Sequence, residues 1–550
     1  MLHVCIVILA QSLILPAVPT MAPGASAPIA GAPSGDIVGV AQAPFVGLSL
    51  SNAVAMALRK NTDLVVAQEN RRIARYQVVA AKGAYDVRLQ IEPSYTFDQQ
   101  AVTNPFFAGP NGLPIQQSTL GAKAGFSGQT LGGTQYGLSA SASRIDDNTS
   151  INSYDPTYTT ALSLRLSHPL ARGAAMDDAK RELELARVNG DLSSDQLLLT
   201  ASGTLVDVSD AYYDLIAGWR NVAIQEDALR LAKEQSEKNQ RLVKQGAAAP
   251  LDIAESDAQV YTYQNNVFSA LQNVARLQNK IKQLTLADPS DPLWLADIVP
   301  TSPPMQAPPE PVLNDIVVAA LKNRPEIAQL RESARNADID LAYARSQVKP
   351  QVDLALGVTE NGFAGAPVPV NSALSTILSG APVPPAYQAG KLGQAWTNAL
   401  DGRFPEYTLG ATIGLPLRNR AALGNLGAAS VQKRTIDTQG TALLQRIQVE
   451  ARNAVQSYRS ACARLIAASA ERAAAERVLQ GEERKFSNGQ STTFLVLQRQ
   501  VSVATARGNE VQAQTDLQEA LVEIDRVGGT IFTRYDVNVS KAGANETAVP

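Results

Sequence analysis

Four segments of the chain carry apolar residues at the three- and four-residue spacing that places them on one face of a helix. These segments are residues 175–245, 251–286, 421–488 and 492–528. Each of the two long segments is followed by a short glycine-bearing turn and then by a shorter segment of the same kind. The pattern therefore predicts two antiparallel helical hairpins, each with one long and one short helix.

The lengths of these helices predict an elongated shape. At 1.5 Å per residue, a helix of roughly 70 residues spans about 105 Å, and a return helix of roughly 35 residues covers about half of it. Two further helical segments, 48–83 and 312–348, have the length needed to cover the other half. We therefore expect two short helices stacked end to end along each long helix, in a helical cylinder.

The chain contains an internal duplication. An offset of 263 residues aligns 50–91 with 313–354 without a gap, with identities such as Leu50/Leu313 and Ala57/Ala320. The two repeats span 44–286 and 312–529. Between them lies 287–311, with eight prolines in 25 residues, which predicts an extended linker.

Each repeat also contains a region of strands, at 85–168 and 351–417. Residues 87–92, 162–166, 352–358 and 409–415 alternate with period two. This alternation fits either a soluble sandwich or a membrane barrel. The segment 121–144, with Gly132 and Gly133 at its centre, predicts a further hairpin.

The two ends of the chain lie outside the repeats. Residues 4–18 form an apolar run that is short for a membrane span and fits the apolar core of a secretory signal peptide, although no Lys or Arg precedes it. We interpret 1–43 as a signal peptide followed by a Pro- and Ala-rich segment; a disordered apolar tail is the alternative. Residues 530–550 are expected to be a C-terminal tail.

Composition argues against several functional classes. The formal net charge of −3, from 48 basic and 51 acidic residues, gives no support to nucleic-acid binding. Two cysteines and two histidines provide neither a disulfide framework nor a zinc site, and no nucleophile–base pair or metal cluster is evident. We therefore expect no cofactor, no metal site and no enzymatic activity.

Several short motifs occur in the same order in both repeats. The first pair is Ala57-Leu58-Arg59-Lys60-Asn61 and Ala320-Leu321-Lys322-Asn323-Arg324-Pro325-Glu326. The second pair, before the long helices, is His168-Pro169-Leu170 and Leu415-Pro416-Leu417. The third pair, at the ends of the long helices, is Gln245-Gly246 and Asn488-Gly489. In this order, the chain from about Leu48 to Gly529 resembles the TolC-like outer-membrane efflux protein family.

The resemblance implies a mainly helical fold with a β domain, assembled as a homotrimer. Four strands per subunit would form a 12-stranded transmembrane barrel in outer-membrane lipid, and twelve helices would form a tunnel in the periplasm. The implied function is an exit duct for small molecules or proteins. Its implied partners are a periplasmic adaptor protein and an inner-membrane transporter of the RND, ABC or MFS type.

The helix tips hold the candidate functional residues. In a trimer, Asp252 and Glu255 share a helix face and could form acidic rings that favour cations, although capping of the helix is an equally simple role. The resemblance implies acidic gate residues in the second tip, but this sequence has Leu495 and Gln498 there. A constriction at that tip would be apolar or neutral.

The turns themselves are the expected docking sites for an adaptor. They contain Gly246, Ala247 and Ala248 in the first repeat and Gly489, Gln490 and Ser491 in the second. Their small residues allow close approach of a partner helix, and ordinary turn chemistry also requires the glycines. A secreted coiled-coil structural or adhesive protein is the alternative function, although it has no use for the duplicated strand regions.

Overall fold

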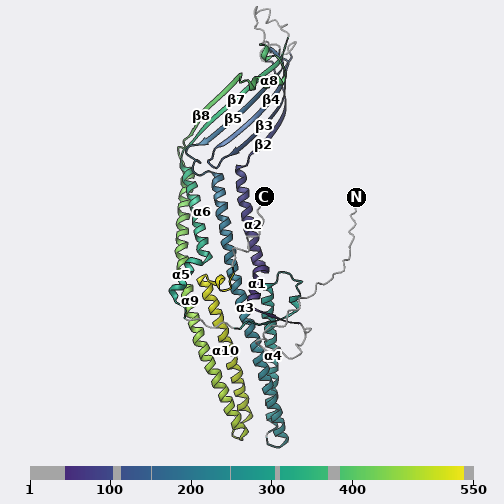
Figure 1. Ribbon diagram of the computed structural model, residues 1–550, viewed down its shortest axis with the longest axis vertical. Coiled ribbons are helices and arrows are strands. Elements are labelled where there is room, and N and C mark those ends of the chain that lie inside the picture. The colour runs from purple at the N-terminus through teal and green to yellow at the C-terminus, as the bar shows by residue number, and fades with distance from the viewer. Residues whose placement is uncertain are drawn as a thin grey trace, which may run out of the picture.

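The computed structural model describes residues 44–102, 113–149, 152–247, 249–303, 310–368 and 385–537. The molecule is long, with a sheet at one end and two helical hairpin tips at the other (Figure 1). The proposed signal peptide at 1–43, Ala248 in the first turn and residues 538–550 of the predicted tail lie outside the described residues.

Two helical hairpins form the end of the molecule opposite the sheet. In the first repeat, the 67-residue helix α3 (Asp178–Lys244) packs against the 36-residue α4 (Pro250–Thr285). In the second, the 68-residue α9 (Arg420–Ser487) packs against the 36-residue α10 (Thr493–Gly528). The near-identical lengths of the two hairpins agree with the duplication in the sequence.

The halves of the long helices nearer the sheet are covered by shorter helices, as the length comparison predicts. These are α1 (Leu50–Lys60) and α2 (Thr62–Lys82) in the first repeat, and α5 (Leu313–Asn323) and α6 (Pro325–Val348) in the second. Helix α2 packs on α3, and α6 packs on both α3 and α9. Beside the sheet, the helices therefore lie in the order α2-α3-α6-α9.

Each of these short segments is two helices rather than the single helix expected from the sequence. The breaks fall at Asn61 and Arg324, which the 263-residue offset aligns. Asn61 has an extended backbone, and its side chain accepts hydrogen bonds from the amides of Asp63 and Leu64. Arg324 precedes Pro325, and a residue before proline is disfavoured in the helical conformation.

The sheet contains six antiparallel strands, so the expectation of four strands per subunit is wrong for this chain. Their order is β2-β3-β4-β5-β7-β8. They are β2 (Arg88–Gln100), β3 (Ile115–Gln129), β4 (Gln135–Asp147), β5 (Tyr154–Pro169), β7 (Gln351–Pro367) and β8 (Phe404–Gly414). The additional pair, β3 and β4, is the hairpin predicted at 121–144, and Gly133 has a φ of 78° in its turn.

A smaller set of elements surrounds the middle of the molecule. Strands β1 (Phe45–Leu48) and β6 (Asp297–Pro300) pair in parallel, and α11 (Ile531–Arg534) packs on α10 and α3 and adds the fully buried Ile531 to the same core. The segment 287–311 is therefore more than an extended linker, because it contributes a short 3-10 helix (Pro292–Leu295) and β6. Residues 530–537 likewise belong to the fold rather than to a tail.

This middle region holds the largest apolar core. Its centre is Tyr212 of α3, whose hydroxyl donates to the Leu48 carbonyl at 2.8 Å and accepts from the amides of Thr301 and Ser302. The indole of Trp219 donates to the carbonyl of Ile298 at 3.0 Å. These bonds join β1, at the start of the first repeat, and β6, in the segment that follows it, to the long helix.

Among the helices of the described residues, none combines the length and the apolar character needed to cross a membrane.

Candidate functional site: the two faces of the sheet and the helix tips

The sheet has one apolar face. A single row of paired residues crosses all six strands and is apolar at every position. The row consists of Leu89, Phe126, Leu138, Leu164, Val358 and Tyr407, whose exposed fractions run from 39% to 73%. A contiguous exposed apolar surface of this kind marks a contact with lipid or with another protein.

The opposite face of the sheet is polar. The neighbouring row, one residue along each strand, consists of Arg88, Ser127, Gly137, Arg165, Gly357 and Thr408. Further from the helices, the same face carries Gln90, Ser139 and Ser163. Because side chains alternate along a strand, neighbouring rows point to opposite faces, and these rows are apolar on one face and mainly polar on the other.

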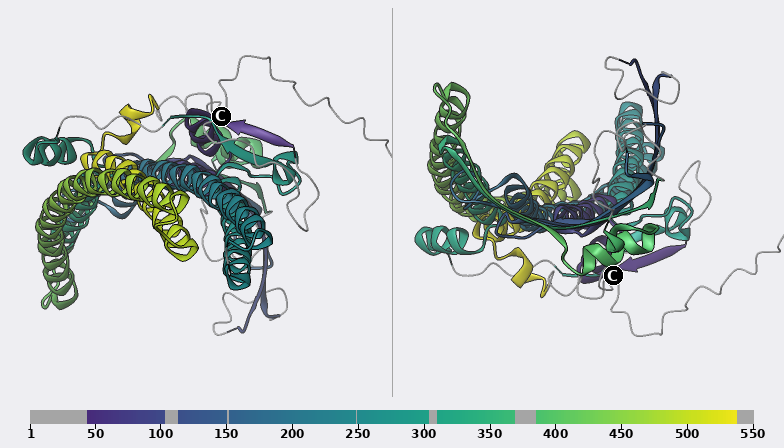
Figure 2. Two further views of the ribbon diagram at one scale, coloured as in Figure 1. Left: turned by 90° about the horizontal axis from the view of Figure 1, so that it is seen from below. Right: turned by 90° about the horizontal axis from the view of Figure 1, so that it is seen from above.

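The sheet and the helices curve together as one wall when seen along the long axis (Figure 2). The short green helix α8 (Leu392–Leu400) lies on the convex side of this wall. Helix α8 packs against the apolar face. Gly362 of β7 points to the same face as Val358, and a Cβ atom at Gly362 would lie 1.9 Å from the carbonyl oxygen of Ala395 in α8. The apolar face is therefore convex and the polar face concave.

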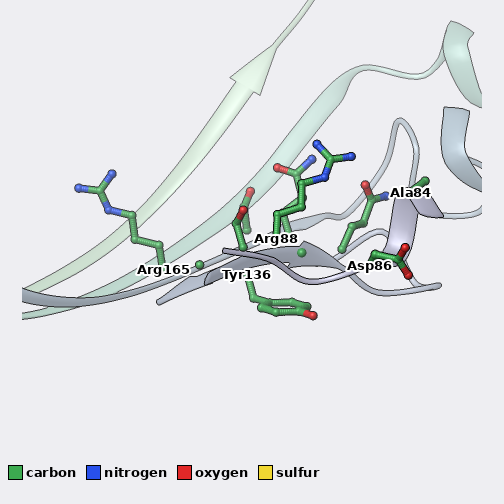
Figure 3. Close-up of a pocket in the computed structure, with 11 residues that line it drawn as sticks. Ala84, Asp86, Arg88, Tyr136 and Arg165 are labelled. Carbon is green, nitrogen blue, oxygen red and sulfur yellow. The ribbon is translucent and has the colours of Figure 1, made fainter. Parts of the chain in front are cut away.

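A hollow of about 410 Å³ opens on the polar face near the helices. Figure 3 shows Arg88 and Arg165 extending from the same side of the sheet, with Tyr136 on the other side. Asp86 is the acidic residue that lines this hollow. The arrangement provides a weakly basic polar surface with no nucleophile–base pair.

The first helix tip is a tight turn closed by backbone bonds. Gly246 has a φ of 72°, and the amides of Gly246 and Ala247 donate to the carbonyls of Val243 and Leu242. This is the glycine-dependent way in which helices commonly end. Gly246 and Ala247 are exposed.

The second tip repeats that geometry. Gly489 has a φ of 71°, and the amides of Gly489 and Gln490 donate to the carbonyls of Phe486 and Lys485. The side chain of Ser491 donates to the carboxylate of Glu482. Gly489 and Gln490 are exposed and Ser491 is partly buried, so both tips present small or polar residues to solvent.

Asp252 caps the return helix α4. Its Oδ2 accepts a hydrogen bond from the amide of Ala249 at 3.0 Å, and the side chain is partly buried. Glu255, one turn further along, is exposed. In the second repeat, Thr492 caps α10 by accepting from the amide of Leu495, which is partly buried, while Gln498 is exposed.

The two hairpins contact each other close to their tips. Buried Asn239 of α3 donates to the carbonyl of Asp252 in α4 and accepts from the hydroxyl of Thr493 in α10, both at 3.4 Å. The ammonium of Lys238 lies 4.6 Å from the ring centroid of Phe486 in α9. These contacts hold the second hairpin against the first.

An ion-pair network joins the hairpins further up. Arg507 of α10 donates to Asp227 of α3 at 2.7 Å and to Glu476 of α9 at 3.0 Å. Partial burial acts to raise the pKa of Asp227, but hydrogen bonds from Arg230 and Arg507 lower it below its ordinary value. The network therefore stabilises the charged form of Asp227 at the seam between the hairpins.

Carboxyl groups also face one another across the α3–α10 seam. Burial, followed by the charge of Asp214, raises the pKa of Asp210 to about 6. Burial, followed by the charges of Asp214 and Asp210, raises the pKa of Glu519 to about 7. Within the described residues, no group of three or more His, Cys, Asp or Glu side chains has the geometry of a metal site.

Several solved outer-membrane proteins share this architecture. The Campylobacter jejuni outer-membrane channel CmeC matches with a TM-score of 0.61 at 14% identity, over 90% of each chain. The outer-membrane protein VceC of Vibrio cholerae matches with a TM-score of 0.61 at 14% identity, over 87% of this chain and 96% of its own. The fold is that of an outer-membrane channel.

A third structure with the same fold was solved in its open state. The open state of the Neisseria gonorrhoeae MtrE outer-membrane channel matches with a TM-score of 0.57 at 16% identity, over 87% of this chain and 88% of its own. No family model matches the sequence, and no match to a curated protein is found. The likeness therefore rests on structure, and it extends along almost the whole chain.

Sequence reasoning missed two features: the contacts that join the two hairpins, and the row of basic residues on the polar face of the sheet. Arg507 and Asp227 are 280 residues apart, and neither belongs to a motif. Arg88 and Arg165 share a row only because of the strand register. The tip turns, in contrast, carry the local signal of a glycine directly after a long helical pattern.

Proposed function

We propose that this protein is an outer-membrane exit duct, formed by several copies of the chain and opening into the periplasm at the helix tips. The observation that carries the proposal is the six-stranded sheet, apolar and exposed on its convex face and polar on its concave face. A curved sheet of this kind fits lipid outside and water inside. The fold shared with outer-membrane channels supports the same conclusion.

The proposed assembly is a homotrimer. Strand β2 continues from α2, and β8 leads into α9, so each side edge of the wall is one continuous strand and helix. Exposed apolar residues lie along both edges, among them Val66 and Tyr76 on α2 and Leu423 and Val431 on α9. Association through these edges would bury them and close the wall.

The proposed partners are a periplasmic adaptor and an inner-membrane transporter. The exposed turns at Gly246–Ala247 and Gly489–Gln490 are the proposed adaptor contacts, because their small residues allow close approach of a helix. A duct of this type takes cargo from the transporter it serves. Its own contribution is passage, with no catalytic step.

Two neighbouring residues of β4 provide a sharp test. Leu138 lies on the apolar face and Ser139 on the polar face. Leu138→Arg would place a charge in lipid at a cost of about 2–4 kcal/mol, and we expect it to reduce the protein recovered in the outer membrane. Ser139→Arg, the matched control, faces water and should leave recovery unchanged.

Membrane fractionation and planar-bilayer recording are the measurements. We expect the unmodified protein and Ser139→Arg to fractionate with the outer membrane and to conduct ions. A soluble protein without conductance would refute the duct and favour a secreted coiled-coil protein. Equal behaviour of the two arginine variants would refute the assignment of the faces.

A further inference from the structure

The two edges of the sheet are compatible with each other. All neighbouring strands in the order β2-β3-β4-β5-β7-β8 are antiparallel, so the edge strands β2 and β8 run in opposite directions. If β8 of one copy pairs with β2 of the next, the antiparallel pattern continues without interruption. The chain thus has the correct strand polarity for closure by identical copies.

Both edges need a partner. Strand β2 has 13 residues and all of them are exposed, while β8 has 11 residues, most of them exposed. Within the described part of the chain, no strand pairs with the outer side of either one. Long open edges are templates for further pairing, and in lipid each unsatisfied backbone group costs several kcal/mol.

The number of strands fits the width of the helical wall. Four helices lie side by side next to the sheet, and at 8–10 Å each they span about 36 Å. Six strands spaced about 4.8 Å apart and tilted by about 40° span about 38 Å along the circumference. Four strands would span only about 25 Å, so they would require the duct to narrow where sheet and helices meet.

We propose that three copies close as an 18-stranded barrel, through pairing of β8 in each copy with β2 in the next. This inference rests on the proposed trimeric duct, and it specifies that the barrel and helical tunnel join without a neck. The backbone radius is about 18 Å for 18 strands and about 12 Å for 12, at the same spacing and tilt. The hairpin β3–β4 supplies the additional strands, and the helix tips become the narrow part of the duct.

Disulfide cross-linking of the full-length protein tests this closure. In a chain carrying Cys5→Ser and Cys462→Ser, Gln90→Cys on β2 is combined in turn with Glu406→Cys, Thr408→Cys or Thr412→Cys on β8. All four positions lie on the polar face, and the three β8 positions sample different registers. We expect at least one pair to give covalent trimers on a non-reducing gel after mild oxidation in membranes.

The matched control replaces Gln90→Cys by Ser139→Cys on β4, with the same three partners. Strand β4 is an inner strand, so an 18-stranded barrel gives no covalent trimer from this pair. If β2 and β3 lay outside the barrel, β4 would be the edge and the barrel would have 12 strands. Trimers from the Ser139 pairs, or none from any Gln90 pair, would therefore overturn the proposal.

The same samples separate this inference from the proposed function. Trimers linked between β2 and β8 that carry no current in bilayers would support the closure and refute the duct. Protein that conducts ions but gives no β2–β8 link in any register would refute the closure and leave the duct intact.

Discussion

Asp252 stands at the tip of the first hairpin with a defined structural role and a proposed functional one. Its carboxylate accepts a hydrogen bond from the amide of Ala249, which satisfies a free donor at the start of α4. Glu255 is exposed one turn later. In a trimer, the two carboxylates of each copy would contribute to an acidic ring at the tips.

We predict that the double variant Asp252→Asn and Glu255→Gln lowers the preference for cations. The asparagine oxygen can still accept from Ala249, so the cap is kept while the charge is removed. Reversal potentials in a salt gradient measure the effect. Glu69→Gln, an exposed acid on α2 far from the tips, is the control; unchanged selectivity in the double variant would refute the acidic ring.

The partly buried carboxyl group of Glu519 predicts how the stability of the protein depends on pH. Its pKa is raised from 4.5 to about 7 by burial and by Asp214 and Asp210 across the seam. Other charges near this pair are Asp207 and Lys280, from α3 and α4, and Asp516 and Glu523, from α10. A raised carboxyl pKa means that the folded state binds more protons than the unfolded state between pH 4.5 and 7, so stability falls as pH rises through this range.

The variant Glu519→Gln should therefore be more stable than the unmodified protein at pH 8, by about 1 kcal/mol after allowance for partial exposure. The gain should disappear at about pH 3, where the carboxyl is protonated in both states. Thermal unfolding at the two pH values is the measurement. The exposed Glu471→Gln on α9 should show no such difference, and a gain that is equal at both pH values would contradict the assignment.

At the scale of elements, the side-by-side arrangement of the hairpins depends on contacts that link α10 to α3. Arg507 of α10 makes one of them, to Asp227 of α3, and it also pairs with Glu476 of α9 within its own hairpin; its side chain is only 34% exposed. Removal of the guanidinium takes one of two arginine partners from each of two partly buried carboxylates, since Asp227 keeps Arg230 and Glu476 keeps Arg472. Such a loss costs more than an ordinary surface ion pair.

We predict that Arg507→Met lowers the free energy of unfolding by about 1–2 kcal/mol and loosens the tips. Faster hydrogen exchange in the backbone near both turns, together with higher conductance, would show the loosening. Arg464→Met is the matched control, because Arg464 pairs with Asp516 at 3.0 Å within one hairpin. If Arg464→Met loosened the tips equally, the network between hairpins would not be the cause.

The sequence was sufficient to predict the helical elements where the signal is local and periodic. The long helices and their return partners, the stacking of shorter helices and the hairpin at 121–144 all follow from spacing, length and glycine positions. The breaks at Asn61 and Arg324 depend on capping, and β6 depends on a partner about 250 residues away in the sequence. Local patterns contain too little information to predict such long-range pairing.

The strand count illustrates the same limit at the candidate site. The alternation predicts β2, β5, β7 and β8, and the glycine pair predicts the hairpin β3–β4 separately, but no local pattern places all six strands in one sheet. The resemblance suggested four, and the register corrects this to six. The exposed apolar face and the pair Arg88 and Arg165 become visible only through that register.

At the scale of the whole molecule, the proposed barrel distributes its basic residues evenly. Arg88 lies on β2 and Arg165 on β5, three strands apart in the same row. From β5 through β7 and β8 to β2 of the next copy is again three strands. Closure by three copies therefore places an arginine at every third strand, near the junction with the helices, if the register is continued between copies.

We predict that Arg88→Gln together with Arg165→Gln shifts ion selectivity toward cations, and that the shift depends strongly on salt. In a lumen with a radius of about 18 Å, wall charges act on the centre only when the Debye length is comparable, which is about 30 Å at 0.01 M and about 3 Å at 1 M. The shift in reversal potential should thus be clear at 0.01 M and absent at 1 M. Arg144→Gln, on the apolar face of β4, is the control and should leave the reversal potential unchanged at both salt concentrations. A shift from the double variant that persisted at 1 M would mean that ions pass close to these arginines, and would contradict a wide barrel that joins the tunnel without a neck.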